Sequence, residues 1–194
     1  MIAMHTNRQL SLKFGAIALM ILLAAFSRVI PHPYNFTPIG AMALFGAAYF
    51  TPRWMAFAIP MLAMWLSDLV LNNLVYASFY PEYYSGFVWI VNGWVYLSFA
   101  IINLAGFTIL QKITPVRLLS ASLGASVLFF IITNFGAWLS SPAYSKDVVG
   151  LISSYAAGIP FFGNTIAGDL CYTALLFGIY EWMKRKNPVW QLQR

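Results

Sequence analysis

The feature that most constrains this chain is a series of long apolar segments that contain almost no charged residues. A helix needs about 20 apolar residues to cross the hydrocarbon core of a bilayer, because each residue adds 1.5 Å. The chain is 61% hydrophobic and 8% charged, far from the roughly 25% charged residues of soluble domains. The sequence therefore predicts an all-α integral membrane protein that forms one transmembrane domain over residues 1–194.

Six segments qualify as transmembrane helices, separated by polar or proline-containing turns. They are residues 12–30, 38–50, 52–72, 87–111, 115–139 and 164–183. The segment 38–50 provides only roughly 20 Å of helix, so it must be short, tilted or shielded by protein. An amphipathic segment, residues 147–162, is expected on the outer side. It ends in a break at Gly-Ile-Pro, residues 158–160.

Three of the predicted helix starts share a threonine followed by a proline. These pairs are Thr37-Pro38, Thr51-Pro52 and Thr114-Pro115. A threonine hydroxyl can cap the free backbone N–H groups of a first turn, and proline suits the first helical position. We expect a helix to begin at each pair.

The basic residues predict the orientation in the membrane. If both termini are cytoplasmic, nine basic residues lie inside and two outside. The inner set is Arg8, Lys13, Arg53, Lys112, Arg117, Lys184, Arg185, Lys186 and Arg194, and the outer set is Arg28 and Lys146. This asymmetry matches the positive-inside rule, so the net charge of +6 reflects topology, and we expect no nucleic acid as a partner.

Polar side chains within the predicted spans fall at one depth. Counted from the cytoplasmic charge of its own helix, each is 15 to 17 residues away, or roughly 22 to 26 Å. They are Arg28, Asp68, Tyr96, Asn134 and Asp169. Ionisable residues inside membranes are costly and usually functional, so we expect them to form a polar cup that opens outward. Alternatively they satisfy one another, with Arg28 paired to Asp68 or Asp169 as a structural bridge.

Helical spacing and the loops add further candidates to this cup. Residues three or four positions apart share a helix face. This spacing pairs Asn72 with Asp68, Asn92 with Tyr96, Trp138 with Asn134, and Thr165 with Asp169. The outer loops are rich in aromatic residues, which suit a large, partly apolar ligand but are also typical of membrane interfaces. They are Tyr76, Phe79, Tyr80, Tyr83, Tyr84, Trp89, Tyr144 and Tyr155.

Residues 31–38, which we name the proline corner, contain three prolines and should form a rigid wall. Within it, His32 is a candidate metal or cobalt ligand, a proton-linked switch or an interfacial hydrogen-bonding group. Asn35 is a candidate helix cap or ligand contact. The small residues of segment 38–50 suit either internal packing or the docking of another membrane subunit.

No motif for catalysis is present. The sequence lacks the GxSxG, HExxH and phosphate-loop patterns, so we expect no enzyme and no bound cofactor. Cys171 is the only cysteine. It is a candidate nucleophile, a soft cobalt ligand or a small core residue.

Four motifs together resemble a known family. They are SRxxPHPxNFTPIxAMALFGAAYF from Ser27, SDL from Ser67, ITNFGxWL from Ile132 and GIPFFGNTxxGDL from Gly158. These motifs, which span Ser27 to Tyr180, resemble the substrate-binding S components of energy-coupling factor (ECF) vitamin transporters. The nearest branch is the solitary cobalamin-transporting S-component family and its bacterial relatives.

The resemblance implies a six-helix S-component fold, a pocket near the outer surface and vitamin uptake by reorientation of the protein in the membrane. It implies cobalamin as a candidate transported substrate, and either an ECF energising module as partner or a solitary mode. Cobalamin-transporting members coordinate cobalt with a cysteine near the outer end of the middle helices, and residues 89–99 contain none here. His32 and Cys171 are then the remaining candidates for that role.

We therefore expect a multi-pass uptake protein of a bacterial inner membrane that binds a vitamin-like small molecule. Two alternatives stay open: a proton-coupled secondary transporter that uses Asp68 or Asp169 as a relay, and a membrane enzyme acting on a cobalamin-like or lipid substrate through His32 or Cys171. The predicted substrate-binding residues are Arg28, His32, Asn35, Asp68, Asn72, Tyr96, Asn134, Trp138, Asn164 and Asp169.

Overall fold

The computed structural model describes residues 2–187, apart from 83, 85 and 91, together with Trp190, and it describes side chains from residue 11 onward. This part of the chain is helical and contains no strand, so the all-α prediction is confirmed. Tyr83 and Arg194 lie outside the described residues, as does the side chain of Arg8.

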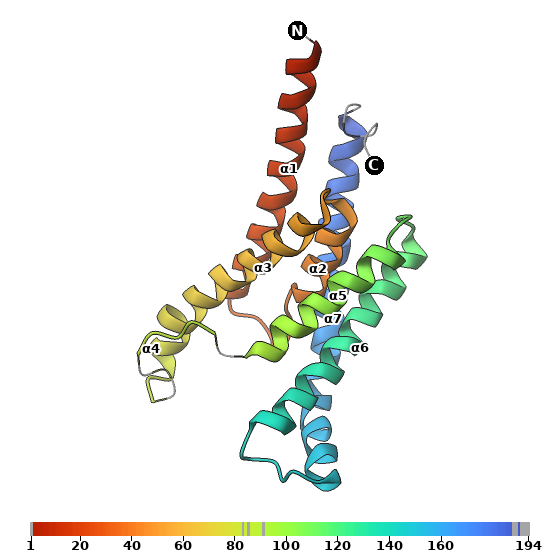
Figure 1. Ribbon diagram of the computed structural model, residues 1–194. Helices are drawn as coiled ribbons and strands as arrows, with labels where there is room; N and C mark the ends of the chain where they lie inside the picture. The colour runs from red at the N-terminus through yellow and green to blue at the C-terminus, as the bar shows by residue number, and fades with distance from the viewer. Residues whose placement is uncertain (1, 83, 85, 91, 188–189, 191–194) are drawn as a thin grey trace.

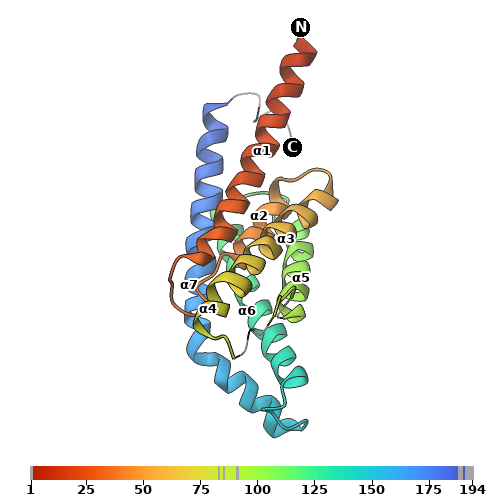
Figure 2. The same ribbon diagram turned by 90° about the vertical axis from the view of Figure 1, so that its left-hand side faces the viewer.

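The helices follow one another with short connections, and the beginning of α1 and the end of α7 lie at the same end of the molecule (Figures 1 and 2). In chain order they are α1 (Ile2–Phe26), the 3₁₀ turn η1 (Ser27–Val29), α2 (Ile39–Tyr49), α3 (Arg53–Val70), the π-helix η2 (Leu71–Tyr76), α4 (Ala77–Phe79), α5 (Gly93–Ile109), α6 (Pro115–Ser140) and α7 (Val148–Lys186).

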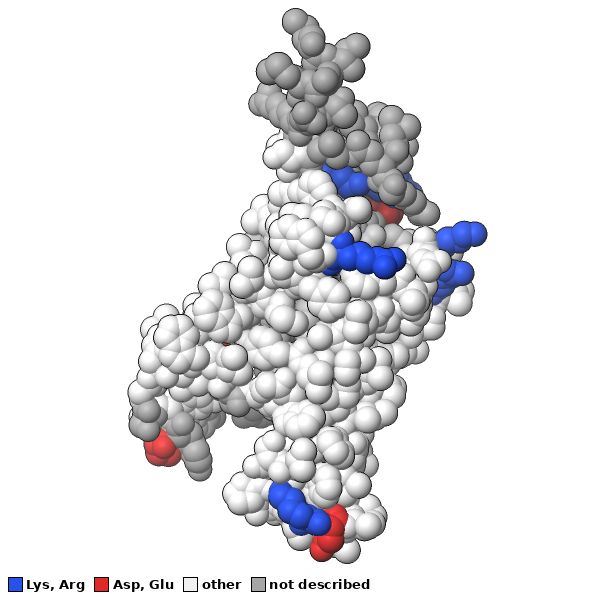
Figure 3. Space-filling model, in the orientation of Figure 1, with Lys and Arg blue, Asp and Glu red and all other residues white. Residues whose placement is uncertain are grey.

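Three stretches are long and apolar enough to cross a membrane. They are Ser11–Val29, Arg53–Phe79 and Pro115–Ser140, and α2 and α5 are shorter apolar helices. Large apolar side chains on these stretches face outward, as Leu23 and Leu62 do. Most of the visible basic side chains gather toward the end where α1 begins and α7 ends (Figure 3). The protein is a membrane protein.

The short helix α2 lies at the centre of the bundle. It packs against α1, α3, α5, α6 and α7, and eight of its eleven residues are buried. This burial explains how a helix too short to span a bilayer is accommodated, because protein rather than lipid surrounds it. The small residues of this segment serve internal packing here: a Cβ on Gly46 would lie 2.8 Å from the carbonyl oxygen of Ala56 on α3.

A buried amide joins three helices around α2. Asn103 on α5 donates from Nδ2 to the carbonyl oxygens of Ala43 on α2, at 3.0 Å, and Ala56 on α3, at 2.8 Å. Its side chain has no exposed surface. A hydrogen bond made inside the bundle replaces one that water cannot supply there, so this residue fixes the spacing of α2, α3 and α5.

The predicted break after residues 147–162 is wrong, because α7 is one helix from Val148 to Lys186. Asp147 caps its start, with its carboxylate accepting from the backbone N–H of Gly150 at 2.8 Å. Proline in a helix interior removes one hydrogen bond and commonly kinks the helix without ending it. Pro160 lies inside α7, and α7 bends in its N-terminal part (Figure 2).

Two further boundaries differ from the prediction. The helix predicted at 52–72 continues through η2 and α4 to Phe79. The helix predicted at 87–111 begins only at Gly93, because Asn92 caps it by accepting from the backbone N–H of Trp94 at 3.0 Å. Before it, Val88 contacts Asn73, whose side chain accepts from Val88 N at 2.7 Å.

A helix begins at or directly after the proline of each Thr-Pro pair, as predicted, but the threonine cap is confirmed at one of the three. Thr114 accepts from the backbone N–H of Arg117 at 3.3 Å, and Pro115 is the first residue of α6. At the other two pairs the residue that precedes the helix is the proline itself, Pro38 or Pro52, without a side-chain cap. The capping roles predicted for Thr37 and Thr51 are therefore wrong.

The close approach of α2 and α3 gives a test of the packing. Alanine normally stabilises a helix relative to glycine by about 0.5–1 kcal/mol. In Gly46→Ala the new Cβ would meet Pro60 Cγ at 2.7 Å and the Ala56 carbonyl oxygen at 2.8 Å, so we expect a loss of about 1–3 kcal/mol from overpacking. Thermal unfolding in detergent measures the change.

The matched control is Gly15→Ala on α1, where nothing lies within 4 Å of the new Cβ. This variant should be as stable as the parent protein or slightly more stable. Equal melting temperatures for the two variants would contradict the central packing of α2.

Candidate binding site

A cavity of about 710 Å³ opens beside the proline corner, and we name it the corner cavity. Its walls come from η1, the corner, the end of α3 with η2 and α4, and α5 and α6. The lining residues are Arg28, Val29, Ile30, Pro31, His32, Tyr34, Asn35, Thr37, Ile39, Asp68, Leu71, Asn72, Val75, Tyr76, Phe79, Tyr80, Tyr84, Asn92, Val95 and Phe129.

A second cavity of about 380 Å³ adjoins it between the corner, α6 and the first part of α7. We name this the adjoining cavity. Four residues line both cavities: Asn35, Asn92, Val95 and Phe129. The two spaces therefore form one continuous recess, in which the side chains of α5 and α6 make a partial wall.

The proline corner is held in shape by a turn and by α7. The backbone N–H of Phe36 donates to the carbonyl oxygen of Pro33 at 3.0 Å, and Asn35 adopts a φ of 62°. Asparagine tolerates this left-handed conformation better than most residues. Asn164 on α7 donates to the carbonyl oxygen of Tyr34 at 2.9 Å. Asn164 thus supports the wall of the cavity rather than lining it.

An ion pair stands on the wall of the corner cavity where three elements meet. Arg28 of η1 donates from Nη1 to Oδ1 of Asp68 on α3 at 2.6 Å and to Oγ of Ser67 at 3.0 Å. Tyr96 on α5 donates its hydroxyl to Oδ2 of Asp68 at 2.6 Å. Both carboxylate oxygens of Asp68 are therefore engaged. The sequence predicted that Arg28, Asp68 and Tyr96 would meet, because each lies at the same depth on its helix. The structure places these three residues together.

The pair leaves the cavity neutral but keeps donor capacity in it. The charges of Arg28 and Asp68 cancel. Among the described residues that line the cavity, His32 is the one further residue that is a histidine, lysine, arginine or acid. Arg28 uses Nη1 for both of its contacts with α3, and 13% of its side chain is exposed. An arginine offers five N–H donors, so an exposed N–H of its guanidinium can still donate to an acceptor on a bound molecule.

Aromatic side chains line a further part of the corner cavity, after Asp68 and Asn72 along η2 and α4 and in the loop that follows. Tyr76, Phe79, Tyr80 and Tyr84 all line it, and the rings of Tyr76 and Tyr84 lie 5.8 Å apart. Burial, and to a lesser extent the neighbouring Tyr76, raises the pKa of Tyr84 above its ordinary value. The Tyr84 hydroxyl therefore stays protonated at neutral pH and can donate a hydrogen bond.

The remaining predicted residues divide between the two cavities. His32, Asn35 and Asn72 line the corner cavity, and Asn134 lines the adjoining cavity. Asn134 donates to the carbonyl oxygen of Phe130, one turn earlier on α6, at 2.8 Å. All four residues therefore line the recess.

Asp169 lies elsewhere, so its predicted place on the floor of the cup is corrected. Its carboxylate is buried, accepts from Oγ of Ser126 at 2.7 Å and accepts backbone hydrogen bonds from Gly40 and Ala41. These N–H groups belong to the first turn of α2, which has no capping side chain of its own. Asp169 therefore caps α2 from a distant part of the chain, and its charge suits the positive end of a helix.

Three more predicted positions are corrected. Trp138 donates from Nε1 to the carbonyl oxygen of Ser145 at 2.9 Å and lines neither cavity. Tyr96 contacts Asp68 behind the wall. Cys171 is exposed on α7 and also lines neither cavity, so His32 is the cobalt-ligand candidate that reaches the recess. No group of three or more His, Cys, Asp or Glu placed to hold a metal occurs in the described part of the chain.

Sequence reasoning missed several wall residues. Val95 and Phe129 line both cavities, but an apolar residue in an apolar helix carries no signal of its position. Asn92 and Thr165 were not missed, because their four-residue spacing from Tyr96 and Asp169 placed them in the predicted cup. Asn92 lines both cavities, and Thr165 lines the adjoining cavity.

The capping role of Asp169 predicts an effect on stability. In Asp169→Ala two backbone N–H groups of α2 lose their buried acceptor, and each such loss costs about 1–3 kcal/mol. Asp169→Asn keeps one acceptor oxygen and should lose less. Thermal unfolding in detergent ranks the variants, and an alanine variant as stable as the parent protein would rule out the cap.

The ion pair predicts that removing both charges destabilises the protein less than removing one of them. Arg28→Met leaves the carboxylate of Asp68 without its cation. This loss is costly because both side chains are largely buried, with 13% and 15% of their surface exposed. The double variant Arg28→Met, Asp68→Leu removes both charges and should unfold at a higher temperature than the single variant. Additive losses in this double-mutant cycle would contradict a coupled pair.

Searches of curated proteins and of solved structures each returned no match. A family model described as "Family of unknown function (DUF6580)" matches residues 8–190. The match includes η1, the proline corner and every residue that lines the two cavities. The chain therefore belongs to the DUF6580 family.

Proposed function

We propose that this protein is an uptake protein of a bacterial cytoplasmic membrane that binds a vitamin-like small molecule in the recess formed by the corner and adjoining cavities. The observation that carries the proposal is the corner cavity itself. It combines a rigid wall, an internally neutralised ion pair with spare donors and an aromatic part.

The proposed topology has six membrane-spanning helices with both termini in the cytoplasm. Three long apolar stretches support it, as does the position of the α1 and α7 ends on one side of the molecule (Figure 1). The central helices α2 and α5 are short, so they cross with the help of the surrounding protein. The excess of basic residues at this end favours a cytoplasmic location, and the recess then opens on the outer half.

The chemistry of the recess favours a ligand with a sizeable apolar or aromatic body and a few hydrogen-bonding groups. Small-molecule sites are mostly apolar, with volumes of about 300–1,000 Å³ and a few placed polar groups. The corner cavity, at about 710 Å³, matches this description. Its polar groups are amides, hydroxyls and the neutral Arg28–Asp68 pair, which suit binding better than bond-breaking chemistry.

The resemblance of the four sequence motifs to ECF S components supports uptake as the purpose of binding. An S component captures its solute from outside and reorients, with energy from a separate module or in a solitary mode. Cobalamin or a related corrinoid is one candidate solute, for which His32 is the side chain in the recess that could reach cobalt. Another vitamin-like solute would need no metal ligand.

Identification of the natural ligand tests the proposal most directly. The full chain is purified in mild detergent, and the small molecules released on denaturation are analysed by mass spectrometry, with cobalt content as the first readout. A single organic solute in near-stoichiometric amount is the expected result. Its retention should fall in an Asn72→Ala variant.

Asn72 suits this comparison because its side chain is 5% exposed and lines the corner cavity. Loss of one polar contact should weaken binding by about tenfold, since a hydrogen bond contributes about 0.5–1.5 kcal/mol. Ser120→Ala is the matched control, because Ser120 donates to its own helix and lines neither cavity. Unchanged retention in Asn72→Ala, or equal losses in both variants, would contradict the assigned site.

An uptake assay in cells separates the proposal from proton-coupled transport. Uptake of the identified solute should persist when an uncoupler collapses the proton gradient while cellular ATP is maintained. Collapse of uptake under these conditions would instead favour a secondary transporter. The contacts of Asp68 and Asp169 hold the fold together, which does not favour either residue as a relay.

A further inference from the structure

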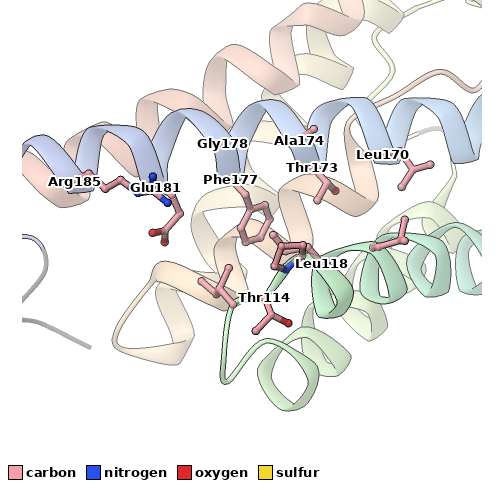
Figure 4. Close-up of a pocket in the computed structure, with 12 residues that line it drawn as sticks. Thr114, Leu118, Leu170, Thr173, Ala174, Phe177, Gly178, Glu181 and Arg185 are labelled. Atoms are coloured by element: carbon pink, nitrogen blue, oxygen red, sulfur yellow. The ribbon is translucent and has the colours of Figure 1, made fainter.

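A groove of about 480 Å³ runs between α6 and α7, on a different part of the molecule from the recess. Figure 4 shows α7 along one side and the start of α6 along the other, with Phe177 and Leu118 directed into the space between them. No residue of the groove lines the corner cavity or the adjoining cavity. It is therefore a separate site.

The groove is apolar on its floor and open along its side. Phe177 and Thr173 form a buried floor, whereas Ala174, Gly178 and Leu119 on the walls are exposed. Small residues on α7 leave this space unfilled: a Cβ on Gly178 would meet nothing within 4 Å. A membrane protein that exposes such a furrow presents it to lipid chains.

One end of the groove is basic. Leu170 lies at one end and Arg185 at the other (Figure 4), and the last turn of α7 carries Lys184, Arg185 and Lys186. Glu181 also lines this end, but its carboxylate pairs with Lys184 at 3.3 Å and accepts from the hydroxyl of Tyr49 at 2.8 Å. The three basic residues of this turn outnumber the one acidic residue beside them, so this end of the groove carries a net positive formal charge.

The dimensions fit a lipid chain. From Leu170 to Arg185 is 15 residues of helix, or about 22 Å. One leaflet of the hydrocarbon core is about 15 Å thick, so the groove is long enough for an acyl chain that extends from the cytoplasmic head-group level past the bilayer centre. A basic end that continues into an apolar furrow is the arrangement that holds an anionic lipid between transmembrane helices.

We infer that this groove is a binding site for an anionic phospholipid of the cytoplasmic leaflet, with an acyl chain along Phe177 and Gly178 and the phosphate beside Arg185. The assignment uses the proposed topology but not the proposed uptake function. A failure of either can therefore be recognised separately.

Native mass spectrometry of the full chain tests the inference. The protein in detergent is titrated with phosphatidylglycerol and, separately, with phosphatidylcholine of the same acyl chains. We expect preferential retention of phosphatidylglycerol. Arg185→Gln should reduce this preference by about fivefold, the effect of one basic residue at a membrane surface.

Filling the groove should remove both lipids. Gly178→Leu places a side chain in the open space, and Gly124→Leu is its matched control, because Gly124 on α6 also has no neighbour within 4 Å of a new Cβ and lies outside the groove. We expect loss of lipid retention in the first variant and normal retention in the second. Thermal unfolding verifies that both are folded.

If Gly178→Leu does not fold, Ala174→Leu one turn earlier makes the same test. Equal retention of the two lipids by the parent protein would overturn the inference. So would an unchanged phosphatidylglycerol preference in Arg185→Gln, or unchanged retention in a folded groove-filling variant. Retention of phosphatidylglycerol that falls in both the groove and the basic-end variants would support it.

Discussion

The structure depends on the burial of α2, a helix too short to cross a bilayer. A buried helix end leaves backbone N–H groups that water cannot reach, and each must find a partner in the protein. Asp169 provides this partner from α7, some 130 residues later in the chain. Its carboxylate, supported by Ser126 of α6, fixes three helices relative to one another. Gly40 on α2 keeps room for it, since a Cβ there would meet Oδ1 of Asp169 at 2.6 Å.

The corner cavity follows from this central arrangement. Once α2 is fixed, the proline corner that precedes it is held against α7 through Asn164 and Tyr34. η1 then presents Arg28 to Asp68 on α3, and Tyr96 on α5 completes the contact. The polar cluster thus joins η1, α3 and α5 at the wall of the cavity, and the aromatic residues of η2 and α4 line the part that follows along the chain. A space with a polar part and an aromatic part is suited to holding a molecule in one orientation.

The two proposed sites meet different requirements of the same fold. The recess lies within protein, where each polar group needs a partner, and its ion pair is therefore neutralised internally. The groove between α6 and α7 opens sideways, and its basic end lies where the charges of α7 reach the head-group level. The proposed solute site and the proposed lipid site therefore use separate side chains, and neither includes a residue of the other.

The sequence by itself determined the class of the protein and the depth of its polar residues. Hydrophobicity along the chain is enough to indicate a membrane protein, and a constant rise per residue brings Arg28, Asp68 and Tyr96 to one level. Only the tertiary structure decided which way each helix is turned about its axis. Asp169 belongs to the same predicted level but contacts Ser126 and the start of α2, and Trp138 contacts the loop before α7. The rotation of a helix depends on packing against several neighbours at once. The continuity of α7 through Pro160 also depends on packing, because α7 contacts both α6 and α2.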